Sequence, residues 1–113
     1  KLKLLYNFAC QVCGYASVRL SKREFYAEGH HLRPVGRPHN GRDDESNVLI
    51  VCPNHHVLLD RFAISIDPKD RQTIISSDKQ LRGKKLLLRH RLSAENVNYH
   101  FQAFRAIHPW MKI

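Results

Sequence analysis

Two stretches of the chain decide the predicted fold: EGHHLRP at residues 28–34 and NVLIVCPNHH at residues 47–56. The apolar run at residues 48–51 has the length and composition of a buried strand. Pro53 follows this run, and proline is favoured in the first turn of a helix, so we expect a helix over residues 54–62. The two stretches therefore predict a strand, a loop, a second strand and a helix, in that order.

The flanking segments complete an α+β domain. Residues 23–33 read as one strand, and residues 63–66 and 73–76 read as a hairpin. Residues 84–92 alternate in polarity like a further strand. Ser93 is a typical N-cap residue for the amphipathic helix expected over residues 94–107.

A chain of 113 residues accommodates one compact domain and is too short for two. We take residues 1–113 as this domain, with a core over about residues 10–67 and a C-terminal extension over residues 68–113. The chain begins at Lys1 and not at methionine. We therefore expect it to be a fragment of a longer protein.

The charge of the chain indicates a polyanionic partner. Lysine and arginine number 19 against 10 aspartate and glutamate residues, for a net charge of +9. Such a surplus on a small domain concentrates nucleic acid near its surface, although basic residues that serve only solubility are an alternative. No stretch approaches the roughly 18–20 apolar residues of a membrane span, so no membrane association is expected.

Three cysteines and one histidine have the spacing of a zinc site. Cys10 and Cys13 are separated by two residues, as are Cys52 and His55. Two such pairs are the usual way to deliver four ligands to one tetrahedral zinc ion, and thiolate with imidazole favours zinc over calcium or magnesium. The alternative is a set of buried cysteines with a redox Cys-x2-Cys pair. A zinc ion with four protein ligands would be structural.

The two opening stretches together resemble the HNH family of ββα-metal nucleases. The string YAEGHHLRPVGRPHNG at residues 26–41, followed by residues 47–60, is most similar to the HNH domains of SRA-HNH modification-dependent restriction endonucleases. The resemblance implies a ββα-metal core beside a Cys3His zinc knuckle, with the C-terminal hairpin, strand and helix added to it. It also implies hydrolysis of DNA phosphodiester bonds with a divalent metal ion.

The resemblance assigns roles to the residues of the motif. His31 corresponds to the general base, Asn47 to the residue that braces the hairpin, and His56 to a ligand of the catalytic metal. His30 corresponds to a second ligand, although neighbours on a regular strand point to opposite faces, so we expect the strand to be twisted, bulged or ending there. Glu28 and Asp60 are weaker candidates for the catalytic metal site.

The sequence and the resemblance also indicate which ions and partners the chain would bind. The catalytic ion would be Mg2+, Mn2+, Ni2+ or Co2+, and the structural ion Zn2+. The resemblance implies double-stranded DNA as partner, a recognition domain elsewhere in the full-length protein, and a bacterial cytoplasmic location. Cleavage of both strands would call for a homodimer. The loop cations Arg33, Arg37, His39 and Arg42 are candidate DNA-binding residues.

Two alternative functions stay open. The first is a zinc-stabilised DNA-binding module without catalysis, which intact His31, Asn47 and His56 disfavour. The second is a homing or toxin-type HNH nuclease, which the RPVGRPHNG string at residues 33–41 disfavours. The cations Arg19, Lys22 and Arg23 fit DNA contact and a solvated surface equally well.

Overall fold

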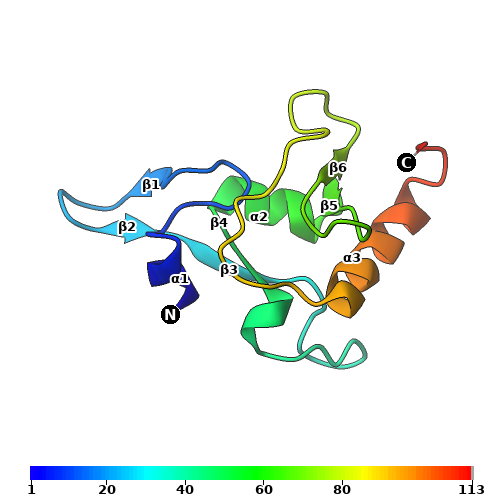
Figure 1. The fold of residues 1–113 in the computed structure, drawn as a ribbon, viewed down its shortest axis with the longest axis horizontal. Helices are drawn as coiled ribbons and strands as arrows, with labels where there is room; N and C mark the ends of the chain where they lie inside the picture. The colour runs from blue at the N-terminus through cyan, green and yellow to red at the C-terminus, as the bar shows by residue number, and fades with distance from the viewer. Residues whose placement is uncertain (113) are drawn as a thin grey trace.

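The centre of the fold is the pair of strands β3 (Glu28–His31) and β4 (Val48–Val51), with helix α2 (Pro53–Asp60) directly after β4 (Figure 1). The computed structural model describes residues 1–112. The strands are antiparallel, and His31 lies opposite Val48. The predicted order of strand, loop, strand and helix is confirmed, as is the α+β fold class.

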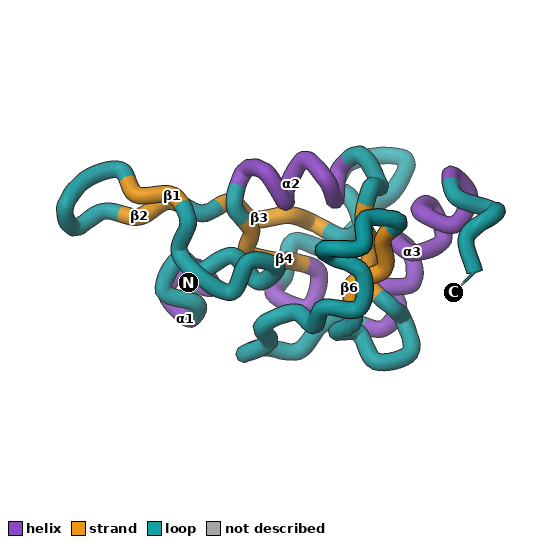
Figure 2. The backbone as a smooth tube through the Cα atoms, turned by 90° about the horizontal axis from the view of Figure 1, so that it is seen from above, coloured by secondary structure: helices purple, strands orange, loops and turns teal. Residues whose placement is uncertain are grey.

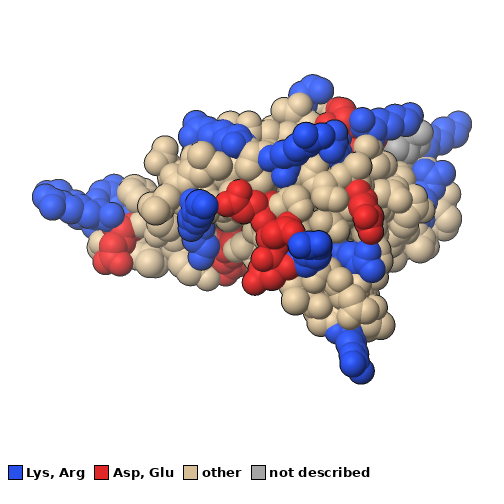
Figure 3. Space-filling view, turned by 60° about the horizontal axis from the view of Figure 1, so that its bottom comes forward, with Lys and Arg blue, Asp and Glu red and all other residues tan. Residues whose placement is uncertain are grey.

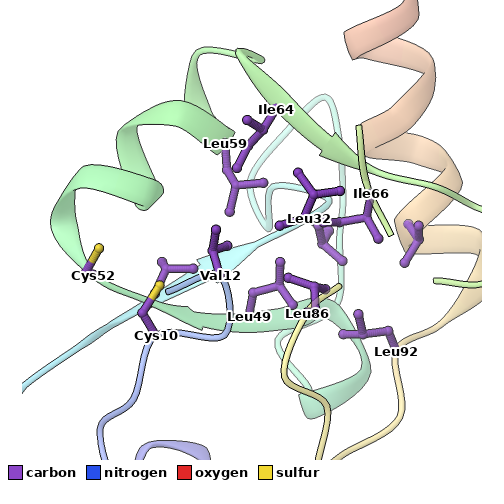
Figure 4. Close-up of a cluster of buried hydrophobic side chains, with 13 residues drawn as sticks. Cys10, Val12, Leu32, Leu49, Cys52, Leu59, Ile64, Ile66, Leu86 and Leu92 are labelled. Carbon is purple, nitrogen blue, oxygen red and sulfur yellow. The ribbon is translucent and has the colours of Figure 1, made fainter. Parts of the chain in front are cut away.

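Strand β4 is buried on both faces, which explains its uninterrupted apolar sequence. Leu49 and Val51 pack into the main hydrophobic cluster, whereas Ile50 packs into a smaller cluster with Tyr6 and Ala27. Figure 4 shows the main cluster between α2 and the C-terminal helix. Its other buried members come from several segments: Cys10, Val12, Leu32, Cys52, Leu59, Ile64, Ile66, Ile74, Leu86, Leu92 and Val97.

The strand predicted over residues 23–33 is wrong in one respect, because it is two strands. Strand β2 (Phe25–Tyr26) pairs with β1 (Val18–Arg19), and β3 pairs with β4. Ala27 lies between them and is buried. The chain changes partner at this residue, so β1 and β2 form a hairpin that projects from the body of the molecule (Figure 2).

The C-terminal part packs against the end of the core that lies away from the β1–β2 hairpin (Figure 1). Strands β5 (Ile64–Ile66) and β6 (Ile74–Ser76) form the predicted hairpin, and helix α3 (Ala94–Ile107) lies beside β5. The side chain of Ser93 accepts a hydrogen bond from the backbone N–H of Asn96, so the predicted N-cap is confirmed.

The strand predicted over residues 84–92 is wrong. Only Lys85 forms a β-bridge, with Thr73. Backbone and amide side-chain hydrogen bonds hold the segment. The N–H groups of Leu86 and Leu87 donate to the backbone carbonyls of Gln72 and Gln11, whose Nε2 atoms donate back to the carbonyls of Leu86 and Leu87. Its polarity pattern arises from packing between two clusters and not from pairing in a sheet.

Two short helices complete the fold. Helix α1 (Leu2–Leu5) begins the chain, and the 3-10 helix η1 (Glu45–Asn47) ends the loop before β4. Asp44 caps η1 by accepting a hydrogen bond from the backbone N–H of Ser46. Over residues 1–112, no helix combines the length and apolar character needed to cross a membrane.

Candidate metal centre and active site

The four residues proposed as zinc ligands converge beside the start of α2. The Sγ atoms of Cys10, Cys13 and Cys52 and the Nδ1 atom of His55 lie within 4.8 Å of one another. Nδ1 of His55 is 3.5 Å from Sγ of Cys10, 3.1 Å from that of Cys13 and 3.3 Å from that of Cys52. Helix α2 provides Cys52 at its N-cap and His55 within its first turn.

The spacing of these atoms is close to that around a tetrahedral ion, with the Nδ1–Sγ distances to Cys13 and Cys52 slightly shorter. Ligand bonds of about 2.0–2.3 Å to zinc place tetrahedral sulfur and nitrogen ligands roughly 3.5–3.8 Å apart. The Sγ atoms of Cys13 and Cys52 are 3.7 Å apart. No cysteine forms a disulfide. Burial raises the pKa of the Cys10 and Cys13 thiols, so a cation is needed to stabilise their thiolate forms.

A second convergence of ligand atoms lies between β3 and α2. One ligand atom from each of His30, His56 and Asp60 lies within 4.8 Å of the others. Nδ1 of His30 is 3.1 Å from Oδ1 of Asp60, and Nε2 of His56 is 3.5 Å from Oδ2 of Asp60. His56 and Asp60 share a helix face because they are four residues apart. Three protein ligands would leave coordination positions open for water and substrate.

Glu28 lies behind this cluster and holds His56 in place. Its Oε1 atom is 2.8 Å from Nδ1 of His56, and its Oε2 atom accepts a 2.7 Å hydrogen bond from the hydroxyl of Tyr26. With Nδ1 bonded to a carboxylate, Nε2 of His56 is the nitrogen free to bind a metal ion. The structure thus places Glu28 as a partner of a ligand. No pattern in the sequence indicated that Tyr26 bonds Glu28.

His30 and His31 point to opposite faces of β3, as in a regular strand. Strand pairing is uninterrupted through His31, the last residue of β3, so no bulge at Gly29 is needed. His30 is buried, with 4% of its surface exposed, whereas the His31 side chain is 33% exposed. Because the strand ends at His31, both imidazoles still line one cavity of about 670 Å³. Helix α3 forms its opposite wall with Tyr99, His100 and Ala103 among others.

His31 has a carboxylate partner that the sequence analysis missed. Oδ1 of Asp43, in the loop before η1, is 2.8 Å from Nε2 of His31. This bond leaves Nδ1 of His31 as the nitrogen able to accept a proton. The run Asp43-Asp44-Glu45 was the one available signal, but it does not reveal which carboxylate meets His31.

Asn47 joins the two ends of the loop between β3 and β4. Its side chain is fully buried and accepts a 2.9 Å hydrogen bond from the N–H of Arg33. It also donates 2.8 Å bonds to the carbonyls of Arg33 and Arg42. Gly41 closes the same loop, because a Cβ atom there would lie 2.0 Å from the Arg33 carbonyl oxygen. The Asn47 side chain therefore ties the end of β3 to the far end of the loop.

Electrostatics keep His30 neutral. Burial and the nearby imidazoles of His100, His56 and His31 lower the pKa of His30 to about 3. Its Nε2 atom is buried and has no hydrogen-bond partner within residues 1–112. A neutral imidazole is the form that binds metal ions. The packing of His100 against His30, at 5.6 Å between ring centroids, was not foreseen.

The candidate DNA-binding residues differ in how far contacts within the protein hold their side chains. Arg33 is held by the His39 carbonyl and lies over the ring of Tyr99, whose hydroxyl is 2.6 Å from Nδ1 of His39. Arg37 and Arg42 are both exposed, but Arg42 forms an ion pair with Asp44. Figure 3 shows acidic side chains gathered in the middle of one face with basic side chains around them. The positive charge is therefore unevenly distributed.

Two comparisons with known proteins found matches to this chain. The sequence profile of the HNH endonuclease family matches residues 10–67, the segment that carries both ligand clusters. A solved structure described as the modification-dependent TagI restriction endonuclease superimposes with a TM-score of 0.77 at 34% sequence identity. The alignment covers 89% of this chain and 35% of that one.

No curated protein matches the chain at a significant level. The profile match includes the histidine strand, the cysteine pairs and α2. Helix α3, which walls the cavity, lies beyond the matched residues 10–67. This chain belongs to the HNH endonuclease family.

Proposed function

We propose that this chain is a divalent-metal-dependent endonuclease module that hydrolyses DNA phosphodiester bonds. One observation carries the proposal: His30, His56 and Asp60 converge, and His30 and Asp60 line a cavity that His31 also lines. A metal ligand set and a candidate base at one cavity are what hydrolysis of a phosphodiester requires. A divalent ion held by the three residues would stabilise the charge that develops on the phosphate and the leaving oxygen.

The residues of the chain supply the proton chemistry. Nδ1 of His31 takes a proton from the attacking water, while Asp43 holds Nε2 and stabilises the imidazolium that forms. Asn47 keeps the end of β3, and with it His31, at a fixed position. Glu28 orients His56. We propose Mg2+, Mn2+, Ni2+ or Co2+ as the catalytic ion. We propose Zn2+ as the ion bound by Cys10, Cys13, Cys52 and His55.

We further propose that the module belongs to a modification-dependent restriction enzyme acting on double-stranded DNA in a bacterial cytoplasm. The aligned solved structure bears that description, and the chain spans about a third of its length. A separate domain would then recognise the modified base. A homodimer would place two sites on opposite strands.

Plasmid cleavage tests the endonuclease proposal. The zinc-loaded chain should nick or linearise supercoiled DNA with Mg2+, Mn2+, Ni2+ or Co2+ and lose this activity with EDTA. His31→Ala should reduce cleavage by at least about 100-fold, with zinc content and fold unchanged. Added imidazole should restore part of the activity, because the His31 side chain is 33% exposed. Duplex binding without cleavage under any metal would support a zinc-stabilised binding module instead.

A further inference from the structure

The β1–β2 hairpin is a projecting arm with a basic tip. It comprises residues 18–26 and ends in the turn Leu20–Glu24, closed by a 2.8 Å hydrogen bond from the Leu20 N–H to the Glu24 carbonyl. Lys22 and Arg23 are exposed in this turn. Figures 1 and 2 place the arm at one end of the molecule, well away from α3.

The tip is ordered by contacts within the arm. The guanidinium of Arg19 donates hydrogen bonds to the carbonyls of Ser21 (2.9 Å) and Lys22 (2.6 Å), and lies 5.5 Å from the centroid of the Phe25 ring. Within residues 1–112, neither Lys22 nor Arg23 forms an ion pair. Arg19 thus stabilises the turn, whereas the side chains of Lys22 and Arg23 are available to bind a partner.

The arm continues into β3, the strand that carries the candidate metal ligand His30. Tyr26, Glu28 and His30 alternate along β2 and β3, so they share one face. The hydroxyl of Tyr26 bonds Glu28, which bonds His56 of the metal cluster. At about 3.3 Å per residue, the tip lies roughly 25–30 Å from His31, which corresponds to about 8 base pairs of duplex.

We infer that the arm is a second DNA contact, in which Lys22 and Arg23 bind backbone phosphates of the duplex that is cut at His31. This inference rests on the proposed function, since it takes DNA as the substrate. The strand residues Arg19, Phe25 and Tyr26 are exposed, so the arm covers little core. Two cations without ion-pair partners among the described residues, at the end of an ordered arm and roughly 25–30 Å along the chain from His31, suit contact with backbone phosphates of a duplex that reaches the cleavage site.

The salt dependence of DNA binding tests the inference. Binding of a duplex of about 24 base pairs, long enough to reach from site to tip, would be measured by fluorescence anisotropy in the His31→Ala background. Each phosphate contact adds about 0.9 to the slope of log affinity against log salt. Lys22→Ala/Arg23→Ala should therefore lower the slope by about 1.8. Between about 50 and 200 mM salt, the parent should lose roughly tenfold more affinity than the variant.

Two control variants make the result specific. Lys69→Ala/Lys79→Ala removes the same charge from exposed positions elsewhere and should leave the slope unchanged. Lys22→Arg/Arg23→Lys keeps both charges and should retain the parent slope. An unchanged slope in the arm variant, an equal loss in the Lys69/Lys79 variant, or no duplex binding by the parent would overturn the inference.

The test also separates the arm from catalysis. With the arm variant in the wild-type background, cleavage at saturating DNA and low salt should be unchanged while KM rises. Absence of cleavage by the wild type would count against the endonuclease proposal, whereas the salt slope concerns the arm alone.

Discussion

Oδ1 of Asp43 lies 2.8 Å from Nε2 of His31, across a loop that Asn47 and Gly41 hold closed. The two residues are twelve positions apart. The carboxylate belongs to an exposed acidic run, and the imidazole ends a central strand. This pairing leaves Nδ1 as the nitrogen of His31 that is free to accept a proton, which supports the proposed role of His31 as base.

The Asp43–His31 pair leads to the first prediction. Asp43→Asn should lower kcat by about 10–100-fold with little change in KM, because the imidazolium loses its negative partner and its orientation. Single-turnover cleavage at saturating metal would measure this change. Glu45→Gln removes a charge two residues away and should behave as wild type. Equal activity of the Asp43 and Glu45 variants would show that Asp43 does not assist His31.

Glu28→Gln should weaken the catalytic metal site. Glu28 bonds Nδ1 of His56, and loss of such a partner typically reduces metal affinity by about 10–100-fold. Cleavage rates measured against Mn2+ concentration would show a higher half-saturation point and a similar maximum. Tyr26→Phe, which removes only the hydrogen bond to Glu28, should cause a smaller shift. An unaltered Mn2+ dependence in the Glu28 variant would argue against this role.

Asn47→Ala should destabilise the domain by about 3 kcal/mol. The substitution leaves the N–H of Arg33 and the carbonyls of Arg33 and Arg42 without their buried partner. Urea unfolding of the zinc-loaded protein would measure the loss. Asn98→Ala on the exposed surface of α3 is the matched control and should cost less than about 0.5 kcal/mol. Similar unfolding midpoints for the two variants would refute the bracing role.

Removal of the zinc ion proposed for Cys10, Cys13, Cys52 and His55 should unfold the core. Cys10 and Cys52 belong to the main hydrophobic cluster, so separation of the ligands would open it. A chelator such as 1,10-phenanthroline should release one zinc per chain and abolish the cooperative thermal transition monitored by circular dichroism. Cys13→Ser should show the same loss without chelator. Full thermal stability of the metal-free chain would contradict a structural role.

Asp70 should make a pH-dependent contribution to stability. Desolvation opposes its ionisation, but hydrogen bonds from Thr73 and Gln72 and the charge of Lys85 outweigh it and lower the pKa of Asp70 to about 2. A folded pKa below the ordinary value means stabilisation that is complete above about pH 4 and is lost as pH falls towards 2. Solvent exposure keeps this contribution small.

The measurement compares wild type with Asp70→Asn by urea unfolding between about pH 7 and pH 3. The difference in free energy of unfolding should be constant at neutral pH and shrink below about pH 4. The comparison with a charge-neutral variant cancels effects common to both proteins, including loss of metal in acid. If the difference in free energy of unfolding between wild type and Asp70→Asn grew as pH fell, it would contradict a lowered pKa of Asp70 in the folded state.

The sequence by itself determined the order of the central elements and the identity of the ligand candidates. The apolar run of β4, the proline at the start of α2 and the cysteine spacing are local signals, because each depends on neighbours a few residues away. The same holds for Ser93 and α3, whose bounds matched the prediction. The roles of His31, Asn47 and His56 came from resemblance and not from periodicity.

Only the tertiary structure decided which residues meet across the chain. The contacts of His31 with Asp43 and of His56 with Glu28 join separate segments. The segment at residues 84–92 alternates like a strand, but it forms a single β-bridge and is otherwise held by isolated backbone and amide side-chain hydrogen bonds. A polarity pattern indicates which positions are buried, but it does not indicate which segment packs against them. Partner choice depends on chain packing, and it sets the hydrogen bonds and pKa values of the site.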